Sequence, residues 1–111
     1  MRTDAPELHA EHAAVLFARV ADTGDTDREL RLAVLERAAG GAAVPEPYDD
    51  LVRQIARDSA MVTDAQVSAV LRAAGSEKNA FELILTAAIG TGLHRWDAAE
   101  AAIEGAADAS A

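Results

Sequence analysis

Apolar residues recur every three or four positions along most of this chain, which is the spacing of α-helices. The longest such stretch runs over residues 80–103, and up to Leu93 its only charged side chain is Glu82. The neighbouring faces are apolar too, so this helix has to be enclosed on most sides, by its own domain or by another copy. The apolar row that identifies the helix consists of Phe81, Ile84, Leu85, Ala88, Gly92, Trp96, Ala99 and Ile103.

Shorter amphipathic segments with helix-capping signals precede this stretch. No segment alternates with the two-residue period of a strand, so the sequence predicts an all-α fold of five or six helices packed around a long Ala- and Gly-rich C-terminal helix. Gly90 and Gly92 are interpreted as positions of close helix contact, because the apolar row continues in phase beyond them. The predicted starts are Asp4, Thr26 with Glu29, Pro47, Thr63 with Gln66, and Ser76; predicted stops include Gly24, Gly40 and Gly75.

The length of 111 residues corresponds to one domain. We predict a single helical domain over residues 1–104 and a frayed tail over 105–111. Much of the apolar content is alanine, so the core is small, and the surplus apolar surface of the last helix favours a homo-oligomer.

Acidic residues outnumber basic ones by 19 to 10, and the net charge is −9. No basic stripe is present, so nucleic acid and anionic membranes are not expected as partners, and the long-range field disfavours an anionic substrate. The apolar run is too short, and too soon followed by His94, Arg95 and Asp97, to span a membrane. The N-terminus has no basic and then apolar signal, which predicts a cytoplasmic protein.

Cysteine is absent, which excludes thiol catalysis, disulfides and thiolate metal sites. No phosphate loop, nucleotide fingerprint or Ser-His-Asp grouping occurs, so no cofactor is predicted. His9 and His12 would share one helix face and could hold a metal ion, but no third ligand stands at a suitable spacing. We interpret this pair as surface or core-edge residues and predict no metal site.

Glu82 and His94 are the candidate catalytic residues. Burial of Glu82 in the apolar run would raise its pKa and suit it to general acid or base chemistry. The alternative is a structural ion pair with an arginine such as Arg53, Arg57 or Arg72, which we favour because buried charges are ordinarily paired. His94 follows about 18 Å along the same helix, so the two groups could meet only across subunits.

Residues 26–103 resemble the later part of the alkylhydroperoxidase-D-like (AhpD-like), or carboxymuconolactone decarboxylase-like, family. The resemblance is carried by VTDAQVSAVLRAAG (residues 62–75), Ser76 and FELILTAAIGTGLHRWDAAEAAI (residues 81–103). It implies the family's helical fold and its assembly into trimers or hexamers. We therefore predict a trimer or a hexamer, with a dimer as the fallback. Redox-active members carry a Cys-x-x-Cys pair followed by a His; this chain has neither that motif nor its helix, so peroxidase or disulfide-reductase activity is not implied.

Two functional hypotheses follow. The first is a redox-inactive AhpD-like helical protein that acts through oligomerisation and binding of a small molecule or a protein partner. The second is a cofactor-free, carboxymuconolactone decarboxylase-like enzyme that uses Glu82 and His94 for proton transfer. We favour the first, because no paired catalytic groups share a helix face.

Overall fold

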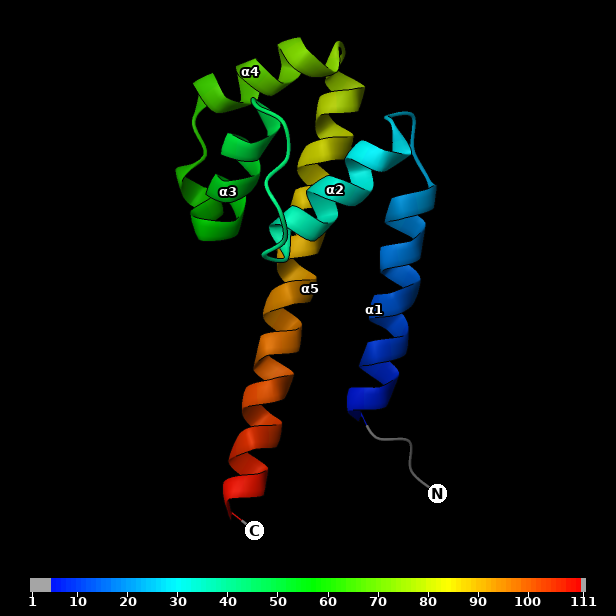
Figure 1. Ribbon diagram of the computed structural model, residues 1–111, viewed down its shortest axis with the longest axis vertical. Coiled ribbons are helices and arrows are strands. Elements are labelled where there is room, and N and C mark those ends of the chain that lie inside the picture. The colour runs from blue at the N-terminus through cyan, green and yellow to red at the C-terminus, as the bar shows by residue number, and fades with distance from the viewer. Residues whose placement is uncertain (1–4, 111) are drawn as a thin grey trace.

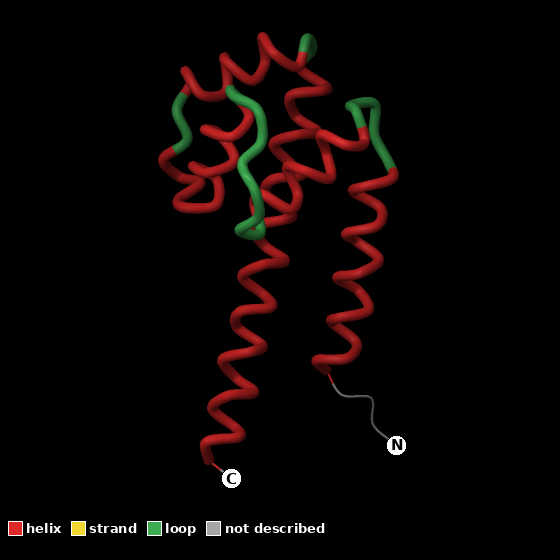
Figure 2. The backbone as a smooth tube through the Cα atoms, viewed as in Figure 1, coloured by secondary structure: helices red, strands yellow, loops and turns green. Residues whose placement is uncertain are grey.

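A computed structural model describes the backbone of residues 5–110 and the side chains of residues 11–108. Over these residues the chain forms helices and loops but no strand, so the all-α prediction is confirmed (Figure 2). The elements are α1 (Ala5–Asp22), α2 (Arg28–Ala38), α3 (Tyr48–Asp58), a 3-10 turn (Ser59–Met61), α4 (Asp64–Ala74) and α5 (Glu77–Ser110).

The 34-residue helix α5 is the spine of the molecule. Helices α2, α3 and α4 gather around its first half, while α1 runs antiparallel to it on another side (Figure 1). Helix α1 and the second half of α5 extend away from this cluster as two arms. The molecule measures 53 × 27 × 21 Å, and the long dimension matches the length of about 51 Å expected for α5 alone.

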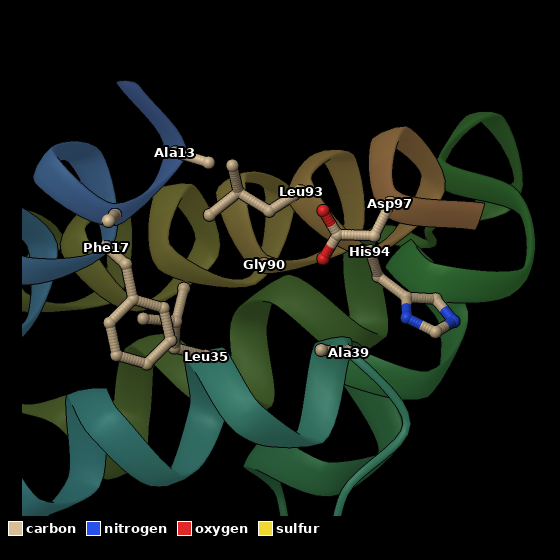
Figure 3. A pocket seen from close by; sticks show the side chains of 9 residues that line it. Ala13, Phe17, Leu35, Ala39, Gly90, Leu93, His94 and Asp97 are labelled. Atoms are coloured by element: carbon tan, nitrogen blue, oxygen red, sulfur yellow. The ribbon is translucent and has the colours of Figure 1, made fainter. Parts of the chain in front are cut away.

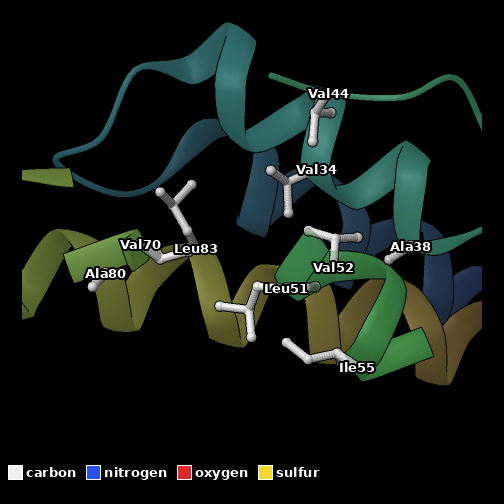
Figure 4. Packing of buried hydrophobic residues seen from close by; sticks show 10 residues of the cluster. Val34, Ala38, Val44, Leu51, Val52, Ile55, Val70, Ala80 and Leu83 are labelled. Carbon is white, nitrogen blue, oxygen red and sulfur yellow. The ribbon is translucent and has the colours of Figure 1, made fainter. Parts of the chain in front are cut away.

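The hydrophobic core lies where α2, α3 and α4 meet the first half of α5 (Figure 4). Val34, Leu35 and Val70 are its most completely buried large side chains. Small residues of α5, together with Leu83, face this core and let the surrounding helices approach closely. The buried cluster consists of Val34, Ala38, Val44, Leu51, Val52, Ile55, Val70, Ala80, Leu83 and Ala87.

The face of α5 that is buried differs from the apolar row that identified the helix in the sequence. Ala80, Leu83 and Ala87 are buried, whereas Phe81 is 65% exposed and Leu85 47% exposed. The first half of the helix is apolar nearly all round, so its periodicity did not indicate which face the other helices would cover.

Local start and stop signals around α4 are confirmed. Thr63 Oγ1 accepts the N–H of Gln66 at 3.2 Å, and the Gln66 side chain accepts the N–H of Thr63 at 3.0 Å. Gly75 ends α4 in the left-handed conformation, with φ of +85°. Ser76 Oγ then accepts the N–H of Asn79 at 3.1 Å and caps α5.

The capping box predicted at Thr26 and Glu29 is wrong. Helix α2 begins after Asp27, and no side chain caps it. The N–H of Thr26, which Glu29 was expected to accept, is donated to the distant Glu82 at 3.0 Å. The predicted cap at Asp4 lies outside the described residues.

The two glycines of α5 have different surroundings. A β-carbon on Gly90 would lie 2.6 Å from the carbonyl oxygen of Leu35, so here the backbone of α5 rests directly on α2. A β-carbon on Gly92 would meet nothing within 4 Å in the described chain. Close contact is therefore confirmed at Gly90 and, in a single copy, is not found at Gly92.

Helix α5 continues through Gly105, where the sequence predicted a frayed tail to begin, as far as Ser110. No described helix is both long and apolar enough to cross a bilayer.

Candidate functional site

A groove of about 450 Å³ lies between α1, the C-terminal part of α2 and the middle of α5. Its walls are mainly apolar, from Phe17 on α1, Leu35 on α2 and Leu93 on α5. Phe17 and Leu35 lie together at one end, while His94 and Asp97 lie at the other (Figure 3). We call this space the α1–α5 groove.

A second hollow of about 260 Å³ adjoins this groove, because both are lined by Ala13 and Leu93. It lies further along the two arms, between His12 and Leu16 of α1 and Trp96 of α5. The apolar space between the arms therefore extends past the groove itself.

Few polar groups face this space. His94 and Asp97 are both exposed, and among the described residues neither side chain takes part in a hydrogen bond or ion pair. Nucleophilic or general-base catalysis usually needs such a group to be oriented by a partner. The arrangement is better suited to holding an apolar group than to activating a nucleophile.

Glu82 lies away from this groove, where α5 passes the loop between α1 and α2. Its carboxylate accepts the N–H of Asp25 at 2.9 Å and the N–H of Thr26 at 3.0 Å. These two N–H groups, with the guanidinium of Arg31 nearby, lower the pKa of Glu82. The raised pKa on which a catalytic role was based is therefore not found, and the carboxylate, as in the favoured structural interpretation, is held ionised and anchors a loop.

Glu82 has a structural role beside an arginine, as favoured, but that arginine is Arg31 and not one of the three suggested, Arg53, Arg57 or Arg72. The Arg31 side chain is buried, at 3% exposure, and donates to the carbonyl oxygen of Val20 at 3.2 Å and of Ala21 at 2.9 Å.

These carbonyl oxygens belong to the last turn of α1, where the helix itself provides no N–H groups to donate to them. Arg31 also donates to the carbonyl of Thr26, and together with Glu82 it ties α1, α2 and α5 together. The sequence could have indicated that Arg31 is buried, because Arg31 lies in the same helical row as Val34, Leu35 and Ala38, which are buried.

The structure does not bring Glu82 and His94 together within one chain. Both lie on the continuous helix α5, about 18 Å apart by helix rise. Glu82 contacts the loop after α1, whereas His94 lines the α1–α5 groove. Their assignment as catalytic residues stays a prediction.

Among the described side chains, no group of three or more His, Asp or Glu residues is placed to hold a metal ion. His12 lies on α1 beside the groove. The side chain of His9 lies outside the described residues, so a joint role of the two histidines stays untested.

Asp49 is a second polar anchor, which the sequence did not point out. It is buried and accepts Arg37 Nε at 2.8 Å, the N–H of Val44 at 3.1 Å and Arg53 Nε at 3.0 Å. Burial alone would raise the pKa of Asp49, but the N–H of Val44 and the guanidinium of Arg37 outweigh it and lower that pKa. This carboxylate holds the loop before α3 and orients two arginines.

Comparison with known proteins returned no match: no protein family, no curated protein and no solved structure matches this chain. The AhpD-like resemblance of residues 62–103 accordingly stays a prediction, and the geometry of the described residues is what supports a function.

Proposed function

We propose that this chain is a redox-inactive, AhpD-like helical protein that acts by assembling with further copies of itself. The observation that carries the proposal is an apolar row on α5 that a single copy leaves exposed. Phe81 is 65% exposed, Leu85 47%, Trp96 42% and Ile103 69%. We define the α5 row as Phe81, Leu85, Ala88, Gly92, Trp96, Ala99 and Ile103, all of which are exposed.

The shape of a single copy supports the same proposal. Its accessible surface is 7155 Å², against about 5,800 Å² expected for a compact monomer of this length. Its radius of gyration is 15.9 Å, against about 13 Å expected. The excess surface exceeds the roughly 800 Å² per partner of a standard interface. Soluble proteins rarely leave large apolar patches uncovered.

The order of large and small residues along the α5 row indicates a second copy as the occupant. The row is nearly symmetrical about Gly92, with Leu85 and Ala99 each seven positions from it, and Ala88 and Trp96 each four. In an antiparallel pair of α5 helices centred on Gly92, Leu85 would lie against Ala99 of the other copy, and Trp96 against Ala88. Large side chains would then meet small ones in the middle of the interface, and Phe81 would lie against Ile103 at each end, so the row is self-complementary as a two-fold interface requires.

The spacing within the row suits a straight pair of helices. The step pattern of four, three and four residues occurs twice, and an 11-residue repeat departs little from the period of an undistorted α-helix. The dimer is therefore the proposed unit. A hexamer of the kind that the resemblance implies would consist of three such pairs.

The pairing does not favour the alternative, a decarboxylase-like enzyme that uses Glu82 and His94. In an antiparallel pair centred on Gly92, Glu82 would lie opposite position 102 of the second copy, and His94 opposite position 90. The two groups would remain about 12 Å apart along the helix axis. Binding and assembly are thus better supported than proton transfer.

Light scattering coupled to size exclusion tests the proposal at tens of micromolar protein. We expect the native chain to be a dimer or a multiple of it, and Leu85→Asp to be a monomer, because a charge would be buried in the interface. Met61→Asp is the matched control: Met61 is 63% exposed on the 3-10 turn, away from α5, so this variant should assemble normally. A monodisperse native monomer would contradict the proposal.

The absence of cysteine allows a direct test of the two-fold axis. A single Gly92→Cys substitution places two thiols at the centre of the proposed pair, so oxidation should link two chains. Ala73→Cys, exposed on α4, is the control that should stay unlinked. A dimer that Gly92→Cys fails to link would place the axis elsewhere.

A further inference from the structure

Four of the ten Lys and Arg side chains line one pocket between α2, α3 and α5. The pocket has a volume of about 360 Å³, and no carboxylate of the described residues lines it. Such a concentration of positive charge is unexpected in a chain with a net charge of −9. The arginines are Arg37 from α2, Arg53 and Arg57 from α3, and Arg95 from α5.

Two of these arginines carry charges that no carboxylate compensates. Arg57 has no ion-pair partner among the described residues, and Arg95 donates only to the carbonyl oxygen of Ala56, at 3.0 Å. Arg37 and Arg53 are different, because Asp49 contacts both of them and fixes their positions. The pocket therefore presents two oriented guanidinium groups beside two uncompensated ones.

A buried hydroxyl at the same pocket has no partner. Thr91 lines the pocket and is only 6% exposed, yet among the described residues its Oγ1 has no hydrogen bond. Thr86, one and a half turns earlier on α5, shows the usual arrangement, with its hydroxyl donating to the carbonyl oxygen of Glu82 at 2.6 Å. A buried hydroxyl without a partner is costly and rare, so Thr91 is a second indication that a polar ligand belongs here.

We propose that this arginine pocket binds the phosphate group of a small organic phosphate. Guanidinium groups approach from three helices, which suits an oxyanion with several acceptor oxygens. The two uncompensated charges match a phosphate monoester, which carries about −1.5 to −2 at neutral pH. A carboxylate is a poorer match, since its single negative charge would neutralise only one of the two uncompensated guanidinium groups and it offers fewer acceptor oxygens.

The negative net charge of the whole chain does not oppose this binding. Charges separated by more than about 8 Å are largely screened at physiological ionic strength, so the arginines that line the pocket dominate the local potential. The cavity is also larger than a bare phosphate needs, which leaves room for the organic part of an ester. One copy supplies every lining residue, so the site does not depend on the proposed assembly.

Calorimetric titration with phenyl phosphate at constant ionic strength tests the site. We expect saturable binding to the native chain at millimolar or lower concentrations. Arg57→Gln should weaken that binding about tenfold or more, because a charge-assisted hydrogen bond is lost. Since Arg57 has no ion-pair partner in the described chain, this variant should keep its fold.

Arg72→Gln is the matched control, since it removes the same charge from an exposed position on α4 outside the pocket. It should change the affinity by less than about twofold, because an exposed charge at a distance is screened. Equal weakening by Arg57→Gln and Arg72→Gln would overturn the proposal, as would the absence of saturable binding. Benzoate that bound as tightly as phenyl phosphate would overturn the assignment to phosphate.

Thr91→Val provides a second readout, because it keeps the shape of the side chain and removes the hydroxyl. Without ligand this variant should unfold at a higher denaturant concentration than the native chain, since an unpaired buried polar atom is gone. The Thr91→Val variant should also bind phenyl phosphate more weakly than the native chain does. Unchanged affinity would overturn the inclusion of Thr91 in the site.

Discussion

The two halves of α5 contain a similar share of apolar residues but lie in different surroundings, and the first half has more large apolar side chains whereas the second has more alanine and more charge. Residues 77–91 are enclosed by α2, α3 and α4, and Ala80, Leu83 and Ala87 are buried there. Over residues 92–108, the part of the second half whose side chains are described, no residue is buried. The same apolar, alanine-rich helix is thus a core element at one end and a surface element at the other.

This difference in burial follows the number of neighbouring helices as well as the size and charge of the side chains. Three helices surround the first half, whereas the second has α1 beside it and a contact from Arg95 to the end of α3 (Figure 1). In an isolated copy, helix propensity and few neighbouring contacts hold the second half in place, and tertiary packing usually contributes more than propensity. A second copy would therefore add most to stability by packing against the exposed half of α5.

The largest expected contrast between the two faces of α5 is between Leu83 and Leu85. Leu83→Ala should lower the free energy of unfolding by about 2–5 kcal/mol, because it leaves a cavity in the core. Leu85→Ala should change it by less than about 0.5 kcal/mol at concentrations where the chain is monomeric. Urea denaturation measures both.

Raising the protein concentration in the same experiment sharpens the contrast. If a second copy covers the α5 row, Leu85→Ala should become destabilising as the protein concentration rises, since assembly stabilises only the folded chain. An unchanged effect of Leu85→Ala at all concentrations would indicate that this face stays exposed. A Leu83→Ala variant as stable as the native chain would contradict the described core.

Gly90 and Gly92 provide a smaller contrast at the boundary between the halves. Gly90→Ala should destabilise the chain by about 1–3 kcal/mol, because its β-carbon would collide with the backbone of α2. Gly92→Ala should stabilise a monomer by up to about 1 kcal/mol through helix propensity. Thermal or urea unfolding of the two variants tests this, and equal effects would contradict the difference in their surroundings.

Glu82 gives the smallest expected effect, and it depends on pH. Its pKa is lower in the folded chain than the unfolded value near 4.5, so its contribution to stability is fully present above that pH and is lost as the pH falls through the folded pKa. Glu82→Gln should therefore cost about 1 kcal/mol at neutral pH and progressively less in acid.

Unfolding experiments across the acid range measure this dependence. Glu104→Gln, on the exposed second half of α5, is the control and should change stability little at any pH. A cost for Glu82→Gln that stayed constant down to the lowest pH would show that the carboxylate does not act through its charge.

The sequence by itself determined the local features of this protein. The helical periods, the capping box of Thr63 with Gln66, the stop at Gly75 and the cap at Ser76 all depend on residues within a few positions of one another. Interactions of this kind form wherever the chain is helical, so they can be predicted without knowing the fold. The all-α class followed from them.

Only the tertiary structure decided which face of α5 is buried, what Glu82 contacts and where the arginines gather. Glu82 meets an N–H group 56 positions away, and that contact replaced the cap expected at Thr26. The arginine pocket likewise combines residues of three helices that no spacing in the sequence connects. The physical reason is that helix periodicity indicates the buried face only when the faces differ, and the first half of α5 is apolar on nearly all of them.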